Sequence, residues 1–326
     1  MPPARPQELF EALRSGDRSA LARAITLVES TREEDVAAAR ELVRRCLPHA
    51  GSSRRIGITG IPGAGKSTLI DALGILLAEQ GHRVAVLAID PSSSRSGGSI
   101  LGDKTRMERL SQHPNAYIRP SPTGGTLGGV GRRTRETLVL CEAAGFDRVL
   151  IETVGIGQSE LAVDRMTDVN LLLMIGGAGD ELQGIKRGIM EAADLIVLTK
   201  TDGDNAERNK RSAGDLRQAI QLLPARDHGE RPGVLLCSAA ENRGIAEVLS
   251  ALDKLCVKLE EQGHTALRRH QQDRWWMRAT IEERLVSGFF ADPRVQAALP
   301  ELERAVTDGS RSPFDAADEL LRFSRD

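Results

Sequence analysis

One stretch of the sequence decides the fold: Gly60-Ile61-Pro62-Gly63-Ala64-Gly65-Lys66-Ser67. It fits the pattern G-x-x-x-x-G-K-[ST], and Thr68 continues it into a predicted helix. The glycines allow backbone N–H groups to point inward around phosphate oxygens, and the helix N-terminus adds its dipole to the same site. Lys66 is expected to contact the β- and γ-phosphates, and the Ser67 hydroxyl to ligate Mg²⁺. We therefore predict a nucleotide-binding loop.

The sequence around this loop alternates between apolar runs and helical patterns. Candidate strands lie at Ile56–Thr59, Val84–Ile89, Tyr117–Arg119, Arg148–Ile151, Val169–Ile175, Leu195–Thr199 and Val234–Cys237. Continuous apolar runs are typical of parallel strands that are buried on both faces. The pattern predicts an α/β fold with a mostly parallel, doubly wound P-loop NTPase sheet, whose ligand lies at the carboxyl ends of the strands.

Three parts are expected along the chain. Residues 1–50 repeat apolar side chains at helical spacing and predict an N-terminal helical extension. Residues 51–255 form the P-loop domain, and residues 256–326 contain only helical patterns, which predict a C-terminal helical arm. In that arm the charged segment around Trp275 and Trp276 offers few inward positions, so we expect its apolar side to pack on another subunit.

Composition excludes several classes of function. The 326 residues are 40% hydrophobic with a net charge of −2, which supports a large core and gives no basis for a nucleic-acid or anionic-membrane partner. The four cysteines include no CxxC pair and are expected to be buried thiols, and the six histidines are dispersed. We find neither an apolar leader nor 18 consecutive apolar residues. A soluble cytoplasmic protein is expected.

A second motif concerns the base. Thr199-Lys200-Thr201-Asp202 directly follows a candidate strand and fits [NT]-K-x-D, a guanine-reading signature. Asp202 could accept hydrogen bonds from guanine N1–H and N2–H₂, which adenine cannot supply, and the Lys200 stem could lie on the purine. Asn is commoner at the first position, and Thr199 lacks its amide. Asp202 could instead be an ordinary helix cap, but its position after a P-loop favours GTP over ATP.

Two further motifs are expected near the nucleotide. Ser238-Ala239-Ala240 fits the S-A loop whose backbone N–H contacts guanine O6. Ile151-Glu152-Thr153-Val154-Gly155 stands where many GTPases carry D-x-x-G. Glu152 could reach Mg²⁺ directly or through water, and the Gly155 N–H could contact the γ-phosphate. Alternatively, Glu152 is an ordinary acidic strand end. Ile156 follows, where small GTPases often have a glutamine that orients water.

Asp90 ends another candidate strand, immediately before Pro91. Its carboxylate could hold a water of the Mg²⁺ shell or the attacking water, or it could simply begin a turn. The small polar residues 92–99 that follow predict a loop that orders on contact with the γ-phosphate, and Asp103 comes soon after it.

Longer strings of the sequence carry a specific resemblance. These are GITGIPGAGKSTLIDALG, AIDPSSSRSGGSILGDKTRM, SPTGGTLGGV, ETVGIGQSE and GAGDELQGIKRGIMEAADL, in order over roughly residues 8 to 290. Together they resemble the MeaB/ArgK-type family, GTPase chaperones of adenosylcobalamin-dependent acyl-CoA mutases, chiefly methylmalonyl-CoA mutase. The resemblance implies membership of the SIMIBI class of dimerising P-loop NTPases, a homodimer built on the C-terminal helices, and bound Mg²⁺ with GTP or GDP.

The resemblance also assigns roles to individual residues. Lys66 and Ser67 match the phosphate and Mg²⁺ residues of the family, and Asp202 matches its guanine reader. Acidic residues around Mg²⁺ and the attacking water correspond to Asp90, Asp103 and Glu152. Residues 177–188 match a mobile loop, switch III, through which such chaperones communicate with the mutase, and its polar residues that influence turnover correspond to Asp180 and Lys186.

Weaker signals leave alternatives open. The glycine-dense stretch 124–131 could be a second nucleotide site, but its spacing favours a tight strand-to-helix turn. Lys186 and Arg187 could stabilise phosphate charge in the transition state, or they could be solvated surface charges. The resemblance favours the first reading for Lys186 alone.

The sequence thus predicts a GTP-hydrolysing chaperone that gates adenosylcobalamin loading and protects or reactivates its mutase. Which acyl-CoA mutase it serves is left open. One alternative is a metal-insertion GTPase of the urease or hydrogenase accessory type, which the lack of a Cys/His cluster disfavours. The other is an ATP-dependent small-molecule kinase, which the guanine signature disfavours.

Overall fold

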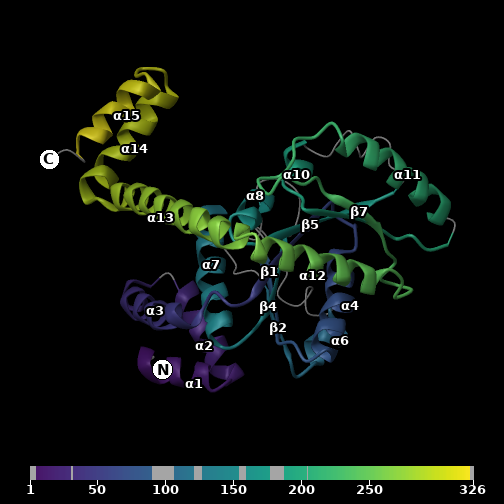
Figure 1. Ribbon diagram of the computed structural model, residues 1–326. Helices are drawn as coiled ribbons and strands as arrows, with labels where there is room; N and C mark the ends of the chain where they lie inside the picture. Colours follow the sequence, from purple (N-terminus) through teal and green to yellow (C-terminus); the bar gives the residue numbers. More distant parts are fainter. Residues whose placement is uncertain are drawn as a thin grey trace. The chain divides into compact units, whose positions relative to one another are not determined.

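Apolar strands, buried along most of their length, form the central layer of residues 1–272, with helices beside them (Figure 1). The computed structural model describes residues 5–30, 32–89, 106–120, 127–153, 159–176, 187–203 and 205–323. Within these ranges the strands are β1 (Arg54–Gly60), β2 (Val84–Ile89), β3 (Ala116–Arg119), β4 (Arg148–Thr153), β5 (Val169–Ile175), β6 (Leu195–Thr199) and β7 (Gly233–Leu236). They form one parallel sheet in the order β3-β2-β4-β1-β5-β6-β7. The predicted strands and the doubly wound α/β class are confirmed.

Helices cover both faces of the sheet, because alternate strand residues point to opposite sides. One face packs against α4 (Lys66–Glu79), α6 (Glu108–Gln112) and α12 (Ile245–Glu261) in a single apolar cluster. The other face carries α7 (Leu127–Ala143), α8 (Ser159–Asp164), α10 (Arg187–Glu191) and α11 (Asn205–Ile220). Strand β1, which leads into the P-loop, lies inside the sheet between β4 and β5.

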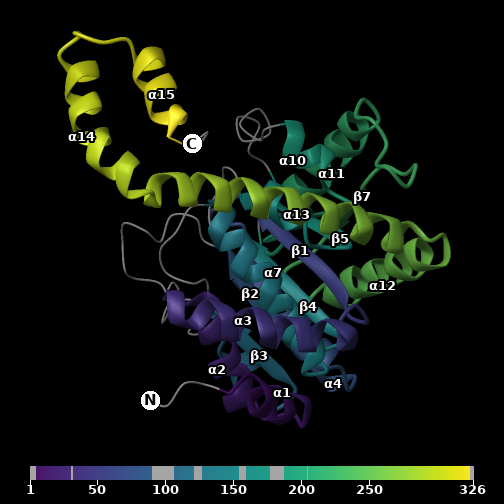
Figure 2. The same ribbon diagram turned by 90° about the vertical axis from the view of Figure 1, so that its left-hand side faces the viewer.

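Helices also make up the described N-terminal residues. They are α1 (Pro6–Arg14), α2 (Arg18–Glu29), α3 (Glu33–Cys46) and a 3₁₀ turn, η1 (Leu47–His49). The three helices pack on one another, and α2 and α3 also pack on α7 (Figure 2). Asp17 caps α2 by accepting hydrogen bonds from the backbone N–H groups of Ser19 and Ala20. The N-terminal helices therefore cover α7, which itself packs on one face of the sheet.

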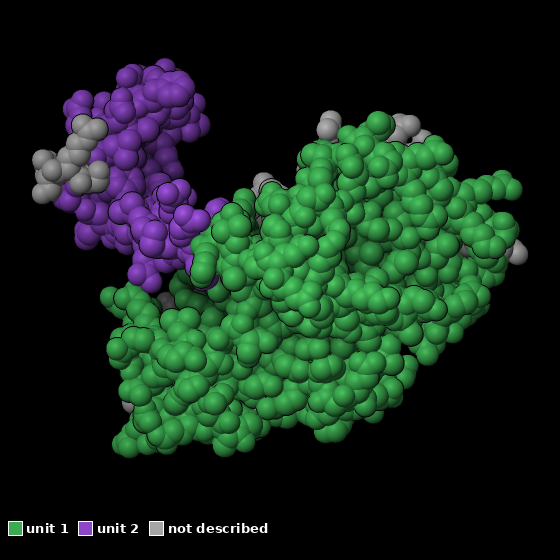
Figure 3. Space-filling model, viewed as in Figure 1, with its two compact units in different colours: residues 1–272 green, residues 273–326 purple. Residues whose placement is uncertain are grey.

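The chain divides into two compact units, residues 1–272 and 273–326 (Figure 3). The second unit contains the end of α13 (His264–Ala291), α14 (Pro293–Thr307) and α15 (Pro313–Arg322). Its own core joins Val295 and Leu302 of α14 to Ala316 and Leu320 of α15. Trp276 is 7% exposed and buried within this chain, whereas Trp275 is at the surface with 37% exposure. In the described residues, no helix combines the length and apolar character needed to cross a membrane.

Candidate nucleotide-binding site

The P-loop lies between the carboxyl end of β1 and the first turn of α4. Gly65 has a φ of 82° and precedes the first helical residue, Lys66, so the chain turns sharply into the helix. Gly60 is equally constrained, because a Cβ atom on it would lie 2.4 Å from the Leu173 carbonyl oxygen of β5. Both glycines therefore have a steric reason, and the loop places the N-terminus of α4 where a phosphate would bind.

Lys66 is buried and turned back on its own loop. Its Nζ donates hydrogen bonds to the carbonyl oxygens of Gly60, at 2.8 Å, and Ile61, at 3.3 Å. Phosphate oxygens would offer the same ammonium stronger, charged acceptors. The geometry suits a side chain that exchanges backbone acceptors for the phosphates of a nucleotide.

Ser67 and Glu152 meet directly beside this loop. The Ser67 hydroxyl donates to Glu152 Oε1 at 3.0 Å, and both side chains are buried. Glu152 lies near the end of β4, paired with Ile58 of β1 on one side and Ala88 of β2 on the other. A hydroxyl and a carboxylate are hard oxygen donors of the kind that Mg²⁺ prefers, so this pair fits the magnesium site that the fold implies.

The base-reading segment is tied to the P-loop through Thr199. Its hydroxyl lies 2.7 Å from the Ala64 carbonyl oxygen and 3.2 Å from that of Met174. The Thr199 hydroxyl is thus directed toward the phosphate loop. Lys200 follows with a left-handed φ of 56° and an exposed side chain.

Asp202 and the S-A loop are in contact. The Ser238 hydroxyl donates to Asp202 Oδ1 at 3.0 Å, so the two predicted base contacts lie side by side. Ser238 is fully buried, Ala239 is half-buried and Ala240 is exposed. Ser238 also pairs with Arg243 through two backbone hydrogen bonds of 2.9 Å. The end of β6 and the loop after β7 therefore form one structural unit.

Two residues at this unit escaped sequence reasoning. Arg243 donates from Nη2 to the Thr201 carbonyl oxygen at 2.6 Å, and Asn209 of α11 donates from Nδ2 to the Lys200 carbonyl oxygen at 3.1 Å. Both act on backbone carbonyls, which every residue type has. Consequently no motif signals them, and only the fold reveals the contacts.

Several predicted residues lie outside the described ranges: Asp90, Asp103, Gly155, Asp180 and Lys186. Residues 177–186 of the predicted switch III loop and 92–99 lie outside them too. The glycine-dense stretch is described from Leu127 onward, where it already belongs to α7. The roles of these residues stay predictions.

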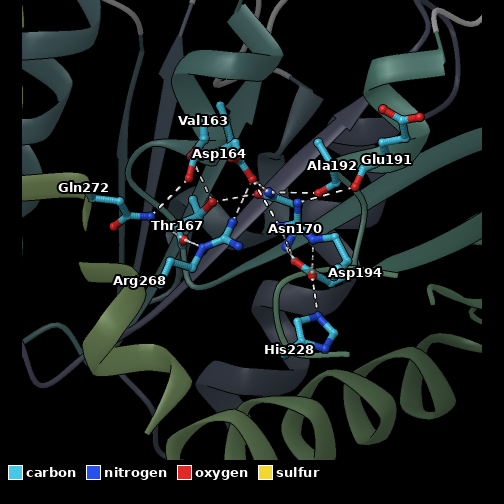
Figure 4. A network of polar contacts seen from close by, with 11 residues as sticks. Val163, Asp164, Thr167, Asn170, Glu191, Ala192, Asp194, His228, Arg268 and Gln272 are labelled. Carbon is cyan, nitrogen blue, oxygen red and sulfur yellow. Dashed lines mark hydrogen bonds and ion pairs between the residues drawn. The ribbon is translucent and has the colours of Figure 1, made fainter. Parts of the chain in front are cut away.

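A second polar cluster lies at the opposite, amino-terminal edge of the sheet (Figure 4). Asp164, at the end of α8, accepts hydrogen bonds from Asn170, Arg226 and Arg268. Asp194, immediately before β6, accepts from Arg226 and from the Asn170 backbone, and lies 3.0 Å from His228 Nε2. Burial by itself raises the pKa of Asp194, but His228 and Arg226 hold it below its ordinary value. The carboxylates of this cluster are already paired with cations.

The same edge continues to β1 and α7. Arg269 forms a two-pronged ion pair with Asp168, and the buried Arg55 guanidinium pairs with the buried Glu142 carboxylate at 2.8 and 2.9 Å. Although burial raises it, the hydrogen bond and charge of Arg55 hold the pKa of Glu142 below its usual value. Ser53 donates a further hydrogen bond of 2.6 Å to Glu142. These internal ion pairs are more readily understood as stabilising the fold than as binding a ligand or taking part in a reaction.

The cysteines are unreactive by position. All four are buried free thiols, as predicted from the sequence. Burial raises the pKa of Cys46 to about 11 and the pKa values of Cys237 and Cys256 to about 12. Thiols of this kind stay protonated and make poor metal ligands.

A parallel doubly wound sheet, a P-loop at its centre and an aspartate-serine pair beyond β6 define the class of protein: a P-loop NTPase with the features of a GTPase. A sequence model described as methylmalonyl-CoA mutase-associated GTPase MeaB matches residues 21–294. The chain belongs to this family and is a GTPase.

Known proteins agree with this assignment over nearly the whole chain. A "Probable GTPase" of Mycobacterium tuberculosis is 52% identical over 316 residues, which are 97% of this chain and 94% of that protein. The mouse protein "Methylmalonic aciduria type A homolog, mitochondrial" is 47% identical over 324 residues, 96% of this chain and 78% of that protein. A solved structure titled "LAO/AO transport system kinase" has a TM-score of 0.76 at 37% identity, and the match covers 100% of this chain and 99% of that one.

Proposed function

We propose that this GTPase is a chaperone of an adenosylcobalamin-dependent acyl-CoA mutase, either methylmalonyl-CoA mutase or a close relative. In this role it gates loading of the cofactor and protects or reactivates the mutase. The observation that carries the proposal is the family match over residues 21–294, since the family is described by its association with that mutase. The name of the mouse relative refers to methylmalonic aciduria, which supports the same partner.

The nucleotide chemistry is assigned to residues at the carboxyl edge of the sheet. Water attacks the γ-phosphate in line, and Lys66 stabilises the charge that develops on the phosphate oxygens. Ser67 and Glu152 would hold Mg²⁺, with Asp90 and Asp103 as the further acidic residues near the metal and the water. When bound, Mg²⁺ neutralises charge on the β- and γ-phosphates. The Gly155 N–H would contact the γ-phosphate.

The base is assigned to Thr199–Asp202 and Ser238–Ala240. The support is the contact between Ser238 and Asp202, which holds the two predicted base-contacting segments together. Wild-type protein should bind GTP far more tightly than ATP in calorimetric titrations. Equal affinities for GTP and ATP would show that these residues do not select guanine, and would favour the alternative of an ATP-dependent small-molecule kinase.

The partner is tested by kinetics. Purified mutase should raise the rate of GTP hydrolysis, because Ile156 replaces a water-orienting glutamine and leaves the isolated enzyme slow. Lys186→Ala should leave basal hydrolysis within a few-fold of wild type but reduce the stimulated rate by about five- to hundredfold, the usual range of a coupling between two sites. If none of the candidate acyl-CoA mutases binds the protein or changes its rate, the chaperone role is wrong.

We also propose a homodimer built on the C-terminal helices. Met277, Ile281 and Leu285 of α13 are 58%, 50% and 68% exposed and follow one another at intervals of four residues, which places them on one side of the helix. An apolar stripe of this kind suits a second copy of the same helix. Replacing Ile281 and Leu285 together by glutamate should give monomers in light scattering that still bind GTP. The neighbouring exposed Glu282→Gln variant is the matched control, and a wild type that is itself monomeric at high micromolar concentration would contradict the proposal.

A further inference from the structure

Each residue of the segment Thr199–Asp202 is held by a different part of the fold. Thr199 contacts the P-loop carbonyl of Ala64 through its hydroxyl. The carbonyl of Lys200 accepts from Asn209 of α11, and the carbonyl of Thr201 accepts from Arg243. Asp202 accepts from Ser238. The position of the proposed base-reading carboxylate therefore depends on contacts outside its own motif.

Asn209 has the most constrained of these contacts. It lies in α11, its side chain is fully buried, and its Nδ2 is 3.1 Å from the Lys200 carbonyl oxygen. Lys200 has a φ of 56°, a left-handed conformation that costs energy for a residue with a side chain. Such a residue persists only when its surroundings fix it, and the Asn209 amide is the group that fixes its carbonyl.

Gly176, directly after β5, leaves Asn209 little freedom. A Cβ atom on Gly176 would lie 1.6 Å from Asn209 Oδ1 and 3.0 Å from Asn209 Cα. Helix α11 and the end of β5 thus approach so closely that a side chain at residue 176 would displace the Asn209 amide. The amide is packed against this glycine, which keeps it aimed at Lys200.

Stability alone does not account for an asparagine here. Within the described residues, Asn209 Oδ1 is buried and has no hydrogen-bond partner. A buried acceptor without a partner is unfavourable, and an apolar side chain of the same shape would avoid that cost. What the apolar side chain could not do is donate to the Lys200 carbonyl.

We propose that Asn209 is a positioning residue for guanine selectivity. By holding the left-handed Lys200 backbone, it sets the course of the chain into Asp202 and thereby the alignment of the carboxylate with the base edge. Gly176 is the complementary residue that makes room for the amide. This inference rests on the proposed role of Thr199–Asp202 as the base-reading segment.

The test uses inosine triphosphate, which lacks the 2-amino group that Asp202 is expected to read. Asn209→Leu keeps the number and branching of the side-chain heavy atoms and removes the donor. The ratio of GTP to inosine triphosphate affinity should fall by about three- to tenfold, the worth of one ordinary hydrogen bond. Ile220→Ala, a buried site at the other end of α11, is the matched control: it should lower the melting temperature and leave the ratio unchanged.

A double-mutant comparison separates positioning from general destabilisation. In an Asp202→Asn background, Asn209→Leu should have little further effect on GTP affinity, because the carboxylate that it aligns is gone. Fully additive losses would overturn the proposal, since Asn209 would then act elsewhere. If Asn209→Leu does not fold, Asn209→Ala and Gly176→Ala test the same point, the latter by displacing the amide.

The outcomes are distinguishable from failure of the base assignment itself. If wild type discriminates between the two nucleotides and the Asn209 variants keep the full ratio, Asn209 has no positioning role. If wild type does not discriminate GTP from either inosine triphosphate or ATP, Asp202 is not the base reader, and both proposals fall together.

Discussion

The two edges of the parallel sheet use the same kinds of polar side chain in opposite ways. At the carboxyl edge, Lys66 contacts backbone carbonyls and Glu152 accepts from the Ser67 hydroxyl. At the amino edge, carboxylates such as Asp164 and Glu142 are paired with guanidinium groups. The hydrogen bonds described for the carboxyl edge join these charged groups to neutral carbonyl and hydroxyl groups, and a charged ligand would offer stronger contacts, whereas the carboxylates of the amino edge are paired with guanidinium groups.

This difference separates a binding site from a structural cluster better than residue type does. Asp194 and Asp168 are carboxylates as deeply buried as Glu152. Both are held by arginines, Asp194 by Arg226 from the loop before β7 and Asp168 by Arg269 from α13. Because each charge is satisfied inside the protein, an incoming phosphate or metal ion would gain little at the amino edge.

Lys66→Ala should give the largest effect, a loss of GTP hydrolysis that concerns the carboxyl edge alone. GTP hydrolysis should fall by at least about a thousandfold, because the transferring phosphate loses its main protein counter-charge. Unfolding in urea should be measured alongside, so that loss of activity is separated from loss of folded protein. The exposed Lys254→Ala variant is the control in a phosphate-release assay. A substantial residual rate would show that Lys66 is not the group that stabilises the charge.

Arg55→Met should lower stability through the amino edge alone. The variant leaves Glu142 buried without its cation and should lower the free energy of unfolding by about 3–5 kcal/mol in urea titrations. Arg54→Met, next to it, removes ion pairs to Asp253 and Glu260 that are open to solvent and should cost about 1 kcal/mol or less. GTP affinity of the folded protein should be unchanged in both.

The double variant Arg55→Met with Glu142→Leu sharpens that result. Replacing a buried ion pair by apolar side chains is often neutral, so much of the lost stability should return. If the double variant were less stable than Arg55→Met alone, the neighbouring donors Ser53 and Gly51, which also contact Glu142, would have to carry the larger part of the interaction.

Asp202→Asn should have an intermediate effect, confined to the base. Loss of charged acceptors for guanine should weaken GTP binding by about 2–4 kcal/mol and improve tolerance for xanthine nucleotides. Titration calorimetry with both nucleotides measures the change. Unfolding in urea serves as the control, because Asp202 contacts only Ser238 among the contacts described for its side chain.

The smallest effect concerns pH. Glu142 and Asp194 have pKa values below their ordinary ones in the folded protein, so the folded state binds fewer protons than the unfolded state in mild acid. Their contribution to stability is present above about pH 4 and is lost as the pH falls through the folded pKa values. The stability gap between wild type and Arg55→Met should therefore shrink on acidification. A gap that is constant from neutral pH to pH 3 would contradict the assignment.

Most of the fold could be predicted from the sequence because its signals are local. Apolar runs such as Val84–Ile89 and Val169–Ile175 became strands with the predicted ends. The P-loop was placed by its own spacing, and the family by long strings of residues. Domain boundaries and the parts of the site at Asp90, Asp103, Gly155 and Lys186 stay predictions.

What sequence could not give are contacts set by packing. Arg226, Arg268 and Arg269 meet the carboxylates of the amino edge only because loops and helices from distant parts of the chain converge there. Asn209 and Arg243 contact carbonyl groups, so neither residue belongs to a recognisable pattern. Their partners are determined by the path of the backbone.

The inward turn of Lys66 has a kinetic consequence for the cycle of nucleotide exchange. Without a nucleotide, the Lys66 ammonium still has hydrogen-bond acceptors, because it donates to the carbonyls of Gly60 and Ile61. If Lys66 binds the phosphates as we propose, departure of the nucleotide would exchange phosphate acceptors for these carbonyls, and the ammonium would not be left without hydrogen-bond acceptors. The P-loop backbone thus supplies the acceptors that the phosphates would otherwise provide.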